Sequence, residues 1–325
     1  MTPSQSSRPA TLAAPALSIV VPVYYNAESL PETVPALAAA ARKIVGDDFE
    51  LIFVDDGSKD ASLAVLEQQR IADRRHVRVV KLTRNFGSMA AILAGLAVSR
   101  GRAVGMISAD LQDPPELFEE MYAQLARGTK CAFAVRRDRE EGPVQRLTTG
   151  LYYRLLRRYA LPGYPAGGFD FCLLDRQVVD ELVRMDEKNA HLMNLIFWLG
   201  FPAAWVPYTR RQRRHGKSRW TLAKKLKLFA DSFVAFSFAP IRAVSIAGFL
   251  LAGLAALYGG VQIWLRIVNG TPVEGFTTIV TLIALTSGIQ MMMLGILGEY
   301  LWRTLDASRK RPQYVVERIF DDLHE

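Results

Sequence analysis

The sequence has few of the residues on which metal clusters, disulfide frameworks and histidine-based catalysis depend. Its 325 residues include two cysteines, Cys131 and Cys172, and four histidines. The two cysteines form neither a metal-ligand spacing nor a disulfide framework, and a reducing compartment suits them. A Ser–His–Asp arrangement is not indicated either, because histidines are scarce and His215 sits in a basic cluster.

Two common nucleotide-binding signatures are also missing. There is no P-loop, which argues against NTP hydrolysis in its usual form. No Gly-x-Gly-x-x-Gly follows the first predicted strand, which argues against a dinucleotide oxidoreductase. Residues 1–16 are rich in Ser, Pro and Ala and no signal-peptide core follows them, so we expect a disordered N-terminal tail.

Charge is absent from two long stretches, residues 243–265 and 275–298. Each exceeds the ~20 residues that a helix needs to cross the hydrocarbon core of a bilayer. We therefore predict two transmembrane helices within 241–302, joined by a short loop. Basic residues flank the outer ends of the pair, so the positive-inside rule places the large domain, both termini and the 303–325 tail in the cytoplasm.

Positive charge is concentrated immediately before these stretches. The net charge is +8, and residues 209–227 carry nine Lys or Arg and no acid, with Trp220 and Phe229 among apolar residues at helical spacing. This pattern predicts amphipathic helices over 209–240 that lie on an anionic membrane surface. A solvated helix face is the alternative. Because the cluster adjoins apolar segments, a membrane is a better partner than nucleic acid.

Residues 17–208 alternate between apolar strands and helices, which predicts an α/β domain with a mostly parallel sheet and helices on both faces. Acidic clusters follow two predicted strands, at Asp55-Asp56 and at Asp110 to Asp113. Ligands bind at the carboxyl ends of such strands, and hard oxygen donors there suit Mg²⁺ or Mn²⁺ holding a diphosphate. The alternative is an Asp-rich turn that only caps the next helix.

Several segments resemble, in the same order, those of the GT-A domain of glycosyltransferase family 2. The similarity is greatest to its polyprenyl-phosphate branch, related to dolichol-phosphate mannose synthase, and in particular to bacterial undecaprenyl-phosphate glucosyltransferases. The segments are Val20–Tyr24, Val54–Ser58, Arg84–Gly87, Ala109–Glu116, Asp170-Phe171, Leu174–Arg176, His215–Arg219 and Gly298–Leu301. The resemblance covers nearly all the chain after about residue 17.

This resemblance implies an inverting transfer of a sugar from a nucleotide sugar, with UDP-glucose as the first candidate, to undecaprenyl phosphate. The reaction would take place at the cytoplasmic face of a bacterial inner membrane and serve modification of cell-envelope glycans such as lipopolysaccharide. It also implies Mg²⁺ or Mn²⁺ as cofactor and a homo-oligomer, up to a tetramer. Alternatives are another sugar (N-acetylhexosamine, mannose or aminoarabinose), a processive polysaccharide synthase, or a non-catalytic nucleotide-sugar-binding membrane protein.

The resemblance further implies a donor site and a metal site at the strand ends. Asp110 would be the main metal ligand, with Gln112 as the second, because Ser108 stands where relatives have the first carboxylate. Whether Asp113 compensates is left open. Tyr25 is inserted in the first loop relative to many relatives. The implied donor-binding residues are Pro22, Tyr24, Glu28, Asp55, Asp56, Asn85, Ser108, Ala109 and Asp110.

The acceptor of the implied reaction is a phosphate monoester, which is largely dianionic near neutral pH and needs no strong base. Because guanidinium groups bind phosphates bidentately, arginines near the site are candidates to bind this acceptor phosphate. The alternative is that these basic residues serve only to attract the protein to a membrane surface. Asp170 matches the family's Asp-Phe motif and is a catalytic candidate beside Asp110, as a base or as an orienting group; a turn Asp is the alternative. The acceptor-phosphate candidates are Arg136, Arg137, Arg213, Lys217 and Arg219.

Overall fold

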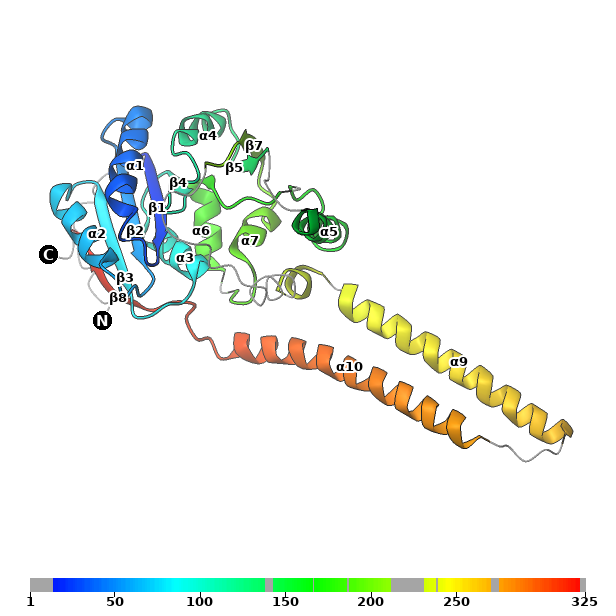
Figure 1. Cartoon of the computed structure of the whole chain (residues 1–325). Coiled ribbons are helices and arrows are strands. Elements are labelled where there is room, and N and C mark those ends of the chain that lie inside the picture. The colour runs from blue at the N-terminus through cyan, green and yellow to red at the C-terminus, as the bar shows by residue number, and fades with distance from the viewer. Residues whose placement is uncertain are drawn as a thin grey trace, which may run out of the picture.

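The protein combines an α/β domain with two long helices that extend away from it (Figure 1). The computed structural model describes residues 14–137, 143–165, 167–185, 187–211, 231–237, 239–269 and 275–321. Arg213, Lys217, Arg219 and most of the predicted 209–240 amphipathic segment lie outside these ranges, as does most of the N-terminal tail.

One eight-stranded sheet organises the α/β domain, in the order β7-β5-β6-β4-β1-β2-β3-β8. Strands β1 to β4 are parallel, as predicted, and β5 pairs in parallel with β7. Strand β6 lies antiparallel between β4 and β5, and β8 lies antiparallel beside β3. The strands are β1 Leu17–Val23, β2 Phe49–Asp55, β3 Val77–Leu82, β4 Ala103–Met106, β5 Cys131–Arg136, β6 Cys172–Asp175, β7 Ala203–Tyr208 and β8 Val316–Phe320.

Helices cover both faces of this sheet, as the alternation of strands and helices predicted. Successive strand residues point to opposite faces, so Ile19 joins a core with α1, α2 and α4, whereas Val20 joins a second core with α3, α6 and α7. The helices are α1 Leu30–Val45, α2 Ser62–Ala72, α3 Ser88–Val98, α4 Leu117–Ala126, α5 Pro143–Tyr159, α6 Arg176–Arg184 and α7 Leu192–Trp198.

Strand β8 was not predicted, because residues 303–325 were expected to form only a cytoplasmic tail. The chain leaves the domain after β7, forms the long helices and returns to extend the sheet. A buried charge cluster fastens the returning strand. Arg78 contacts Asp321 at 3.0 Å and Glu50 at 3.0 Å, and Arg100 contacts Glu50 at 2.9 Å. The C-terminal segment is therefore part of the folded domain.

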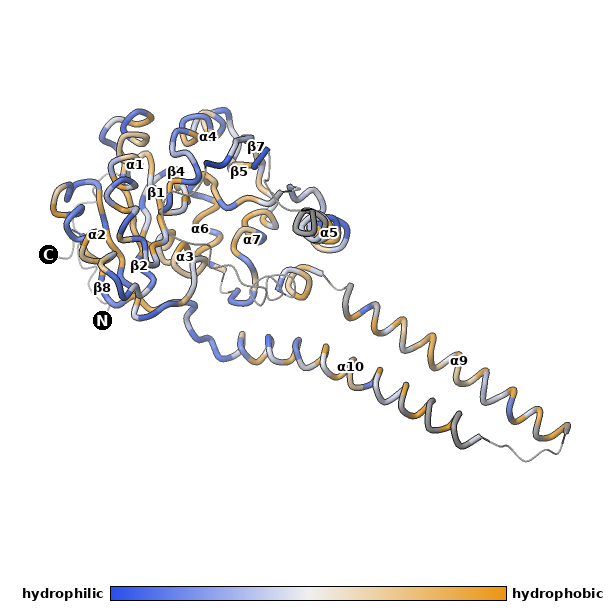
Figure 2. Tube along the Cα trace, in the orientation of Figure 1, coloured by the Kyte–Doolittle hydropathy of each residue, from blue (hydrophilic) through white to orange (hydrophobic). Residues whose placement is uncertain are grey.

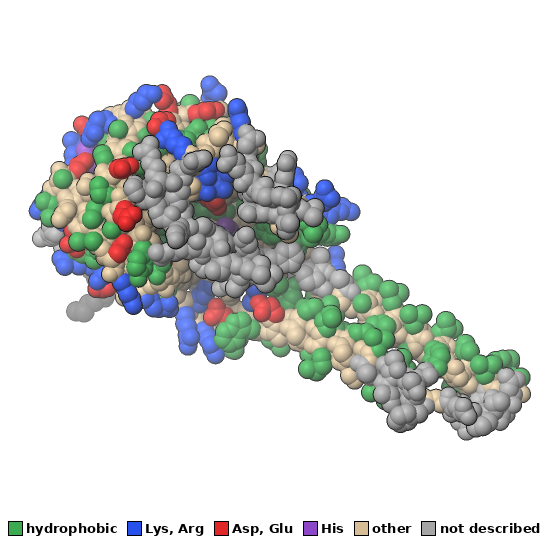
Figure 3. Space-filling view, in the orientation of Figure 1, with side chains coloured by type: hydrophobic (Ala, Val, Ile, Leu, Met, Phe, Trp, Pro, Cys, Tyr) green, Lys and Arg blue, Asp and Glu red, His purple; other side chains and the backbone are tan. Residues whose placement is uncertain are grey.

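The two long helices, α9 Ala239–Asn269 and α10 Phe276–Ser308, contain the predicted membrane spans. Among the described residues, one stretch, Val244–Leu265 of α9, is long and apolar enough to cross a membrane, with a mean hydropathy of 1.9. The same criterion does not identify α10, so the two-span hairpin is not confirmed. Hydrophobic residues recur along both helices (Figure 2) and many lie on the outer surface of the pair (Figure 3).

A polar cluster joins the end of α10 to the α/β domain. Arg303 contacts Asp231 at 2.7 Å and Glu299, one turn earlier on α10, at 2.8 Å. It also donates a hydrogen bond to the carbonyl of Asn189, in the loop before α7, at 3.1 Å. Its side chain is only 14% exposed. Arg303 therefore pairs with Glu299 within α10 and also holds that helix against the α/β domain.

Candidate active site

The sheet brings the predicted functional loops to one edge. The parallel strands β1 to β5 and β7 end at this edge, and the antiparallel strand β6 begins there, so the loop that precedes β6 reaches the same edge. The start of α1 fixes the loop after β4, because Ser29 and Thr33 both donate hydrogen bonds to the Ala109 carbonyl, at 2.8 and 2.9 Å. We call this the catalytic edge, the edge that parallel α/β sheets use for ligands.

The loop after β4 presents Asp110 at the catalytic edge in a half-buried position. Its Oδ1 atom accepts hydrogen bonds from the Ser108 hydroxyl at 2.8 Å and from the backbone amide of Gln112 at 3.3 Å. Leu111 between them adopts a left-handed φ of 52°, which turns the chain tightly. Ser108 therefore orients the neighbouring carboxylate.

Asp113, two residues after Leu111, is enclosed by other protein groups. It is 1% exposed. Its Oδ1 accepts the Tyr208 hydroxyl hydrogen and lies 3.2 Å from Arg210 Nε, while its Oδ2 lies 3.1 Å from the Ser108 hydroxyl, whose single hydrogen it shares with Asp110. Because these protein groups occupy both oxygens, Asp113 joins the loop after β4 to the end of β7.

The Asp110 loop offers a divalent cation few protein ligands. Within the described ranges, no three His, Cys, Asp or Glu side chains lie close enough together to hold a metal ion. The available donors are the half-buried Asp110 carboxylate and the side-chain amide oxygen of Gln112. The amide nitrogen of the same side chain, Nε2, lies 3.5 Å from the Arg211 carbonyl. Such a set fits Mg²⁺ or Mn²⁺, since Mg²⁺ takes one or two carboxylates and completes its shell with substrate phosphates and water.

Asp55 and Asp56 shape the neighbouring loops from buried positions. They are 0% and 2% exposed, and burial raises the pKa of both carboxyls. Asp56 accepts hydrogen bonds from the backbone amides of Phe86 and Gly87, at 2.7 and 2.9 Å, which partly offset that rise. Both acids thus lie at the catalytic edge as predicted, but Asp56 directly holds the loop between β3 and α3.

Gly57 is required where the β2 turn approaches that same loop. Its φ is +70°, and a Cβ atom there would lie 2.6 Å from the Arg84 carbonyl carbon. Asn85, a predicted donor-site residue, follows Arg84 and is exposed at the edge. The turn after β2 and the loop after β3 are therefore packed directly against each other at the catalytic edge.

The loop after β1 accommodates the inserted Tyr25 by a left-handed φ of 57°. The Tyr25 amide donates to the Ser58 hydroxyl at 3.1 Å, and the Tyr24 amide donates to Asn26 Oδ1 at 3.0 Å. Pro22 is half-buried within β1, and Glu28 is exposed at the start of α1. The predicted first-loop residues are therefore at the same edge as Asp110.

The structure brings two acceptor-side candidates into direct contact. Arg136, the last residue of β5, contacts Asp170 at 2.9 Å, although the two are far apart in sequence. Arg136 Nε also donates to the Tyr208 hydroxyl at 3.3 Å. Arg137 is exposed, and its amide donates to the Tyr208 carbonyl at 2.8 Å. Tyr208 and Arg210 were not predicted as site residues. They could have been found from the sequence because they lie at the carboxyl end of a predicted strand, where α/β sheets place their ligand-binding residues.

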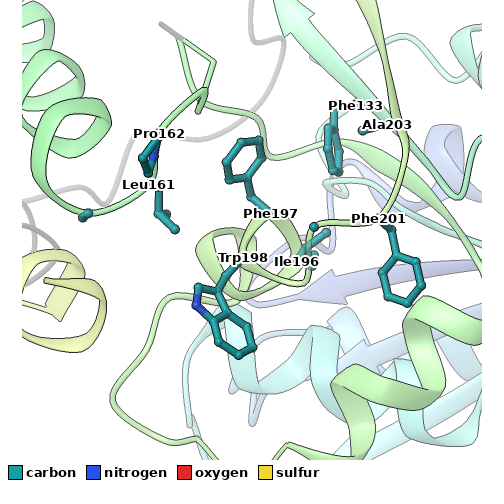
Figure 4. A pocket seen from close by; sticks show the side chains of 10 residues that line it. Phe133, Leu161, Pro162, Ile196, Phe197, Trp198, Phe201 and Ala203 are labelled. Carbon is teal, nitrogen blue, oxygen red and sulfur yellow. The ribbon is translucent and has the colours of Figure 1, made fainter.

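The cavity in Figure 4 belongs to a different region. It has a volume of about 530 Å³ and is lined mainly by apolar side chains, among them Leu161, Phe197, Trp198 and Phe201. It also touches Ala203, the first residue of β7, whereas the catalytic edge is at the other end of that strand. None of its lining side chains is ionisable, so the polar loops, rather than this cavity, form the candidate active site.

Comparison with known proteins decides the family. The sequence profile described as glycosyl transferase family 2 matches residues 18–183, which include β1 to β6 and the loops described above. The chain belongs to glycosyl transferase family 2. The resemblance drawn from the sequence motifs is thereby confirmed, and the protein is a glycosyltransferase.

Relatives of this family 2 glycosyltransferase match along most of their length. It is 37% identical to an uncharacterized glycosyltransferase, YkcC, of Bacillus subtilis (strain 168), over 93% of this chain and 94% of that protein. It is 31% identical to the bactoprenol glucosyl transferase of Shigella phage SfV, over 93% of this chain and 98% of that protein. Among solved structures, the mannosyltransferase PcManGT from Pyrobaculum calidifontis, in complex with GDP-Man and Mn²⁺, matches with a TM-score of 0.46 and 16% identity, covering 86% and 87% of the two chains.

Proposed function

We propose that this glycosyltransferase moves a sugar from a nucleotide sugar, foremost UDP-glucose, to undecaprenyl phosphate at the cytoplasmic face of a bacterial inner membrane. One structural observation carries the proposal. The Asp110 loop, suited to a nucleoside diphosphate, and the Arg136–Asp170 pair, suited to a phosphate monoester, share one sheet edge, linked through Asp113 and Tyr208. Relatives named bactoprenol glucosyl transferase, aligned over nearly the whole chain, support the same acceptor.

The donor side consists of the loops after β1, β2, β3 and β4. Asp110 and Gln112 would hold Mg²⁺ or Mn²⁺, which would neutralise part of the charge on the leaving diphosphate. Asp56 keeps the β3–α3 loop in place for the nucleoside. The residues proposed to contact the nucleotide sugar remain those expected from the sequence: Pro22, Tyr24, Glu28, Asp55, Asp56, Asn85, Ser108, Ala109 and Asp110.

The acceptor side consists of Arg136, Asp170 and the basic residues that follow β7. In the reaction an oxygen of the lipid phosphate bonds to the sugar C1 as the bond from C1 to the diphosphate breaks, so no proton must first be removed from a dianionic acceptor. Arg136 would orient that phosphate, which is a positioning effect. Arg137, Arg213, Lys217 and Arg219 would add positive charge near it, and Asp170 would release Arg136 as the phosphate arrives.

We further propose that both α9 and α10 cross the membrane. Residues 276–298 of α10 carry no charge. The two helices approach closely, since a Cβ atom at Gly248 would lie 3.7 Å from Met293 Cε. Because α10 returns to the sheet through β8, both ends of the pair belong to the same domain. This arrangement suits an active site that receives its acceptor from the adjacent leaflet.

The test is product formation by the full-length protein in phospholipid vesicles with undecaprenyl phosphate, Mg²⁺ or Mn²⁺ and a mixture of nucleotide sugars. Mass analysis should find a lipid-linked single sugar. The variant Asp110→Ala should give no product while its circular dichroism stays unchanged, whereas Asp180→Asn, an exposed acid on α6, should match the wild type. Absence of product with every donor would refute the proposal, long polymer would favour a processive synthase, and donor binding without turnover would favour a non-catalytic role.

A further inference from the structure

A series of polar contacts crosses the catalytic edge from the donor side to the acceptor side, in which Asp110 and Asp113 share the single hydrogen of the Ser108 hydroxyl. It runs from Asp110 through Ser108 and Asp113 to Tyr208, and from Tyr208 to Arg136. None of the family motifs quoted above contains Tyr208. It is the last residue of β7, it is 6% exposed, and it lies between the two subsites.

The direction of the hydrogen bonds around Tyr208 is fixed by chemistry. An ionised carboxylate only accepts and a guanidinium only donates, while a phenol carries one proton and can do both. Tyr208 therefore donates its hydrogen to Asp113 and accepts from Arg136 Nε at 3.3 Å. Burial, followed by the charge of Asp113, raises the pKa of Tyr208, so the phenol keeps this proton near neutral pH.

The two partners of the Arg136 guanidinium differ in how firmly they are held. Asp170 has a side chain that is 63% exposed, so it can move aside at small cost, whereas the Arg136 side chain is 18% exposed. Tyr208 is buried, and its own partner Asp113 is held by Ser108 at 3.1 Å and Arg210 at 3.2 Å. The fixed contact of Arg136 is thus Tyr208.

We propose that Tyr208 is a positioning residue that holds Arg136 ready for the lipid phosphate by anchoring it to Asp113 beside the donor loop. The inference rests on the proposed function, because it takes Arg136 as an acceptor ligand. With Nε held by Tyr208, the Nη2 group of Arg136, which donates to Asp170 at 2.9 Å, lies at the acceptor subsite that Asp170 marks. The arriving phosphate replaces Asp170 and leaves the Tyr208 contact intact.

The test measures binding without turnover, using full-length protein in lipid nanodiscs and farnesyl phosphate as the acceptor probe. Tyr208→Phe keeps the ring and removes only the hydroxyl. Loss of a hydrogen bond to a charged group should weaken farnesyl phosphate binding about tenfold. The dissociation constant of UDP, measured in a separate titration, should stay within about twofold, because Asp113 keeps Ser108 and Arg210. Tyr122→Phe, which removes a hydroxyl from α4, should bind both probes as the wild type does.

A second comparison separates positioning from a general structural effect. If Tyr208 acts through Arg136, then Tyr208→Phe should add no further loss of farnesyl phosphate binding to an Arg136→Ala protein. Independent, additive losses would overturn the inference. So would an unchanged dissociation constant in Tyr208→Phe when the wild type binds the probe, an outcome that leaves the proposed function intact. Failure of the wild type to bind farnesyl phosphate would instead refute the proposed acceptor, and the inference with it.

Discussion

Glu50 offers the most direct test of how the chain is fastened after it returns from the long helices. The side chain is 1% exposed. One carboxylate oxygen accepts from the Ser18 hydroxyl and the Arg100 amide, both at 2.7 Å, and the other accepts from Arg78 at 3.0 Å and from the Arg100 side chain at 2.9 Å. Arg78 in turn contacts Asp321, directly after β8. Glu50→Gln keeps the shape and removes the charge.

Removing one partner from a buried ion pair costs about 3–5 kcal/mol. The lower end applies here, since the Arg100 side chain is 37% exposed and partly screened by water. A loss of about 3 kcal/mol should lower the Tm of the α/β domain by about 6–12 °C. Thermal unfolding of the full-length protein in detergent, followed by intrinsic fluorescence, measures this shift. Glu119→Gln is the matched control: it breaks the exposed contact with Lys43 and should change the Tm by less than about 2 °C.

The pH dependence of the Tm difference between the wild type and Glu50→Gln isolates the contribution of the Glu50 charge. Burial by itself would raise the pKa of Glu50, but the hydrogen bonds from Ser18 and the Arg100 amide, with the charges of Arg78 and Arg100, lower it below 4.5. A lowered pKa means that the carboxylate stabilises the folded state above pH 4.5 and that this stabilisation is lost as the pH falls through the lowered value. The Tm gap between wild type and Glu50→Gln should therefore be constant above about pH 5.5 and narrow below pH 4.5. A gap that stays the same at low pH, or equal Tm values for Glu50→Gln and Glu119→Gln, would refute this reasoning.

Three further predictions concern other parts of the molecule. Gly105→Ala should destabilise the protein by about 1–3 kcal/mol in thermal unfolding, because its Cβ would lie 2.3 Å from the fully buried ring of Phe118; an unchanged Tm would contradict this. Asp56→Asn should weaken UDP binding about tenfold in calorimetry, since an amide cannot accept both backbone hydrogen bonds of the β3–α3 loop; equal affinity would show that the loop holds its own shape. Arg303→Leu should increase proteolysis between α10 and β8, because Asp231 loses its buried partner; an unchanged digestion pattern would count against this.

The sequence predicted the strands and helices of the α/β domain well, because their periods and boundaries are local. The run from Leu17 to Val23 is almost entirely apolar and is buried on both faces of the sheet, as a central strand must be. It also predicted that Asp55, Asp56 and Asp110 would meet at one edge, since parallel strands bring their carboxyl ends together. The family followed from the order of short motifs and was confirmed by the comparison over residues 18–183.

The sequence pattern did not show which strands pair with one another in the sheet. An apolar run says that a strand is buried and does not say which strand it joins. Strand β6 could not be placed antiparallel between β4 and β5, and that placement is what sets Asp170 beside Arg136. Strand β8 has two consecutive exposed residues, Glu317 and Arg318, so its sequence resembles a tail, and only its pairing with β3 makes it part of the sheet.

The sequence by itself therefore determined the α/β class, the family, the acidic loops and the two uncharged stretches, because each depends on residues that are neighbours along the chain. The tertiary structure alone decided what each polar group does. The sequence left the role of Asp113 open, and in the structure its carboxylate is enclosed by Ser108, Tyr208 and Arg210. A carboxylate binds a ligand or a neighbouring side chain according to what surrounds it, and those surroundings come from segments that only folding brings together.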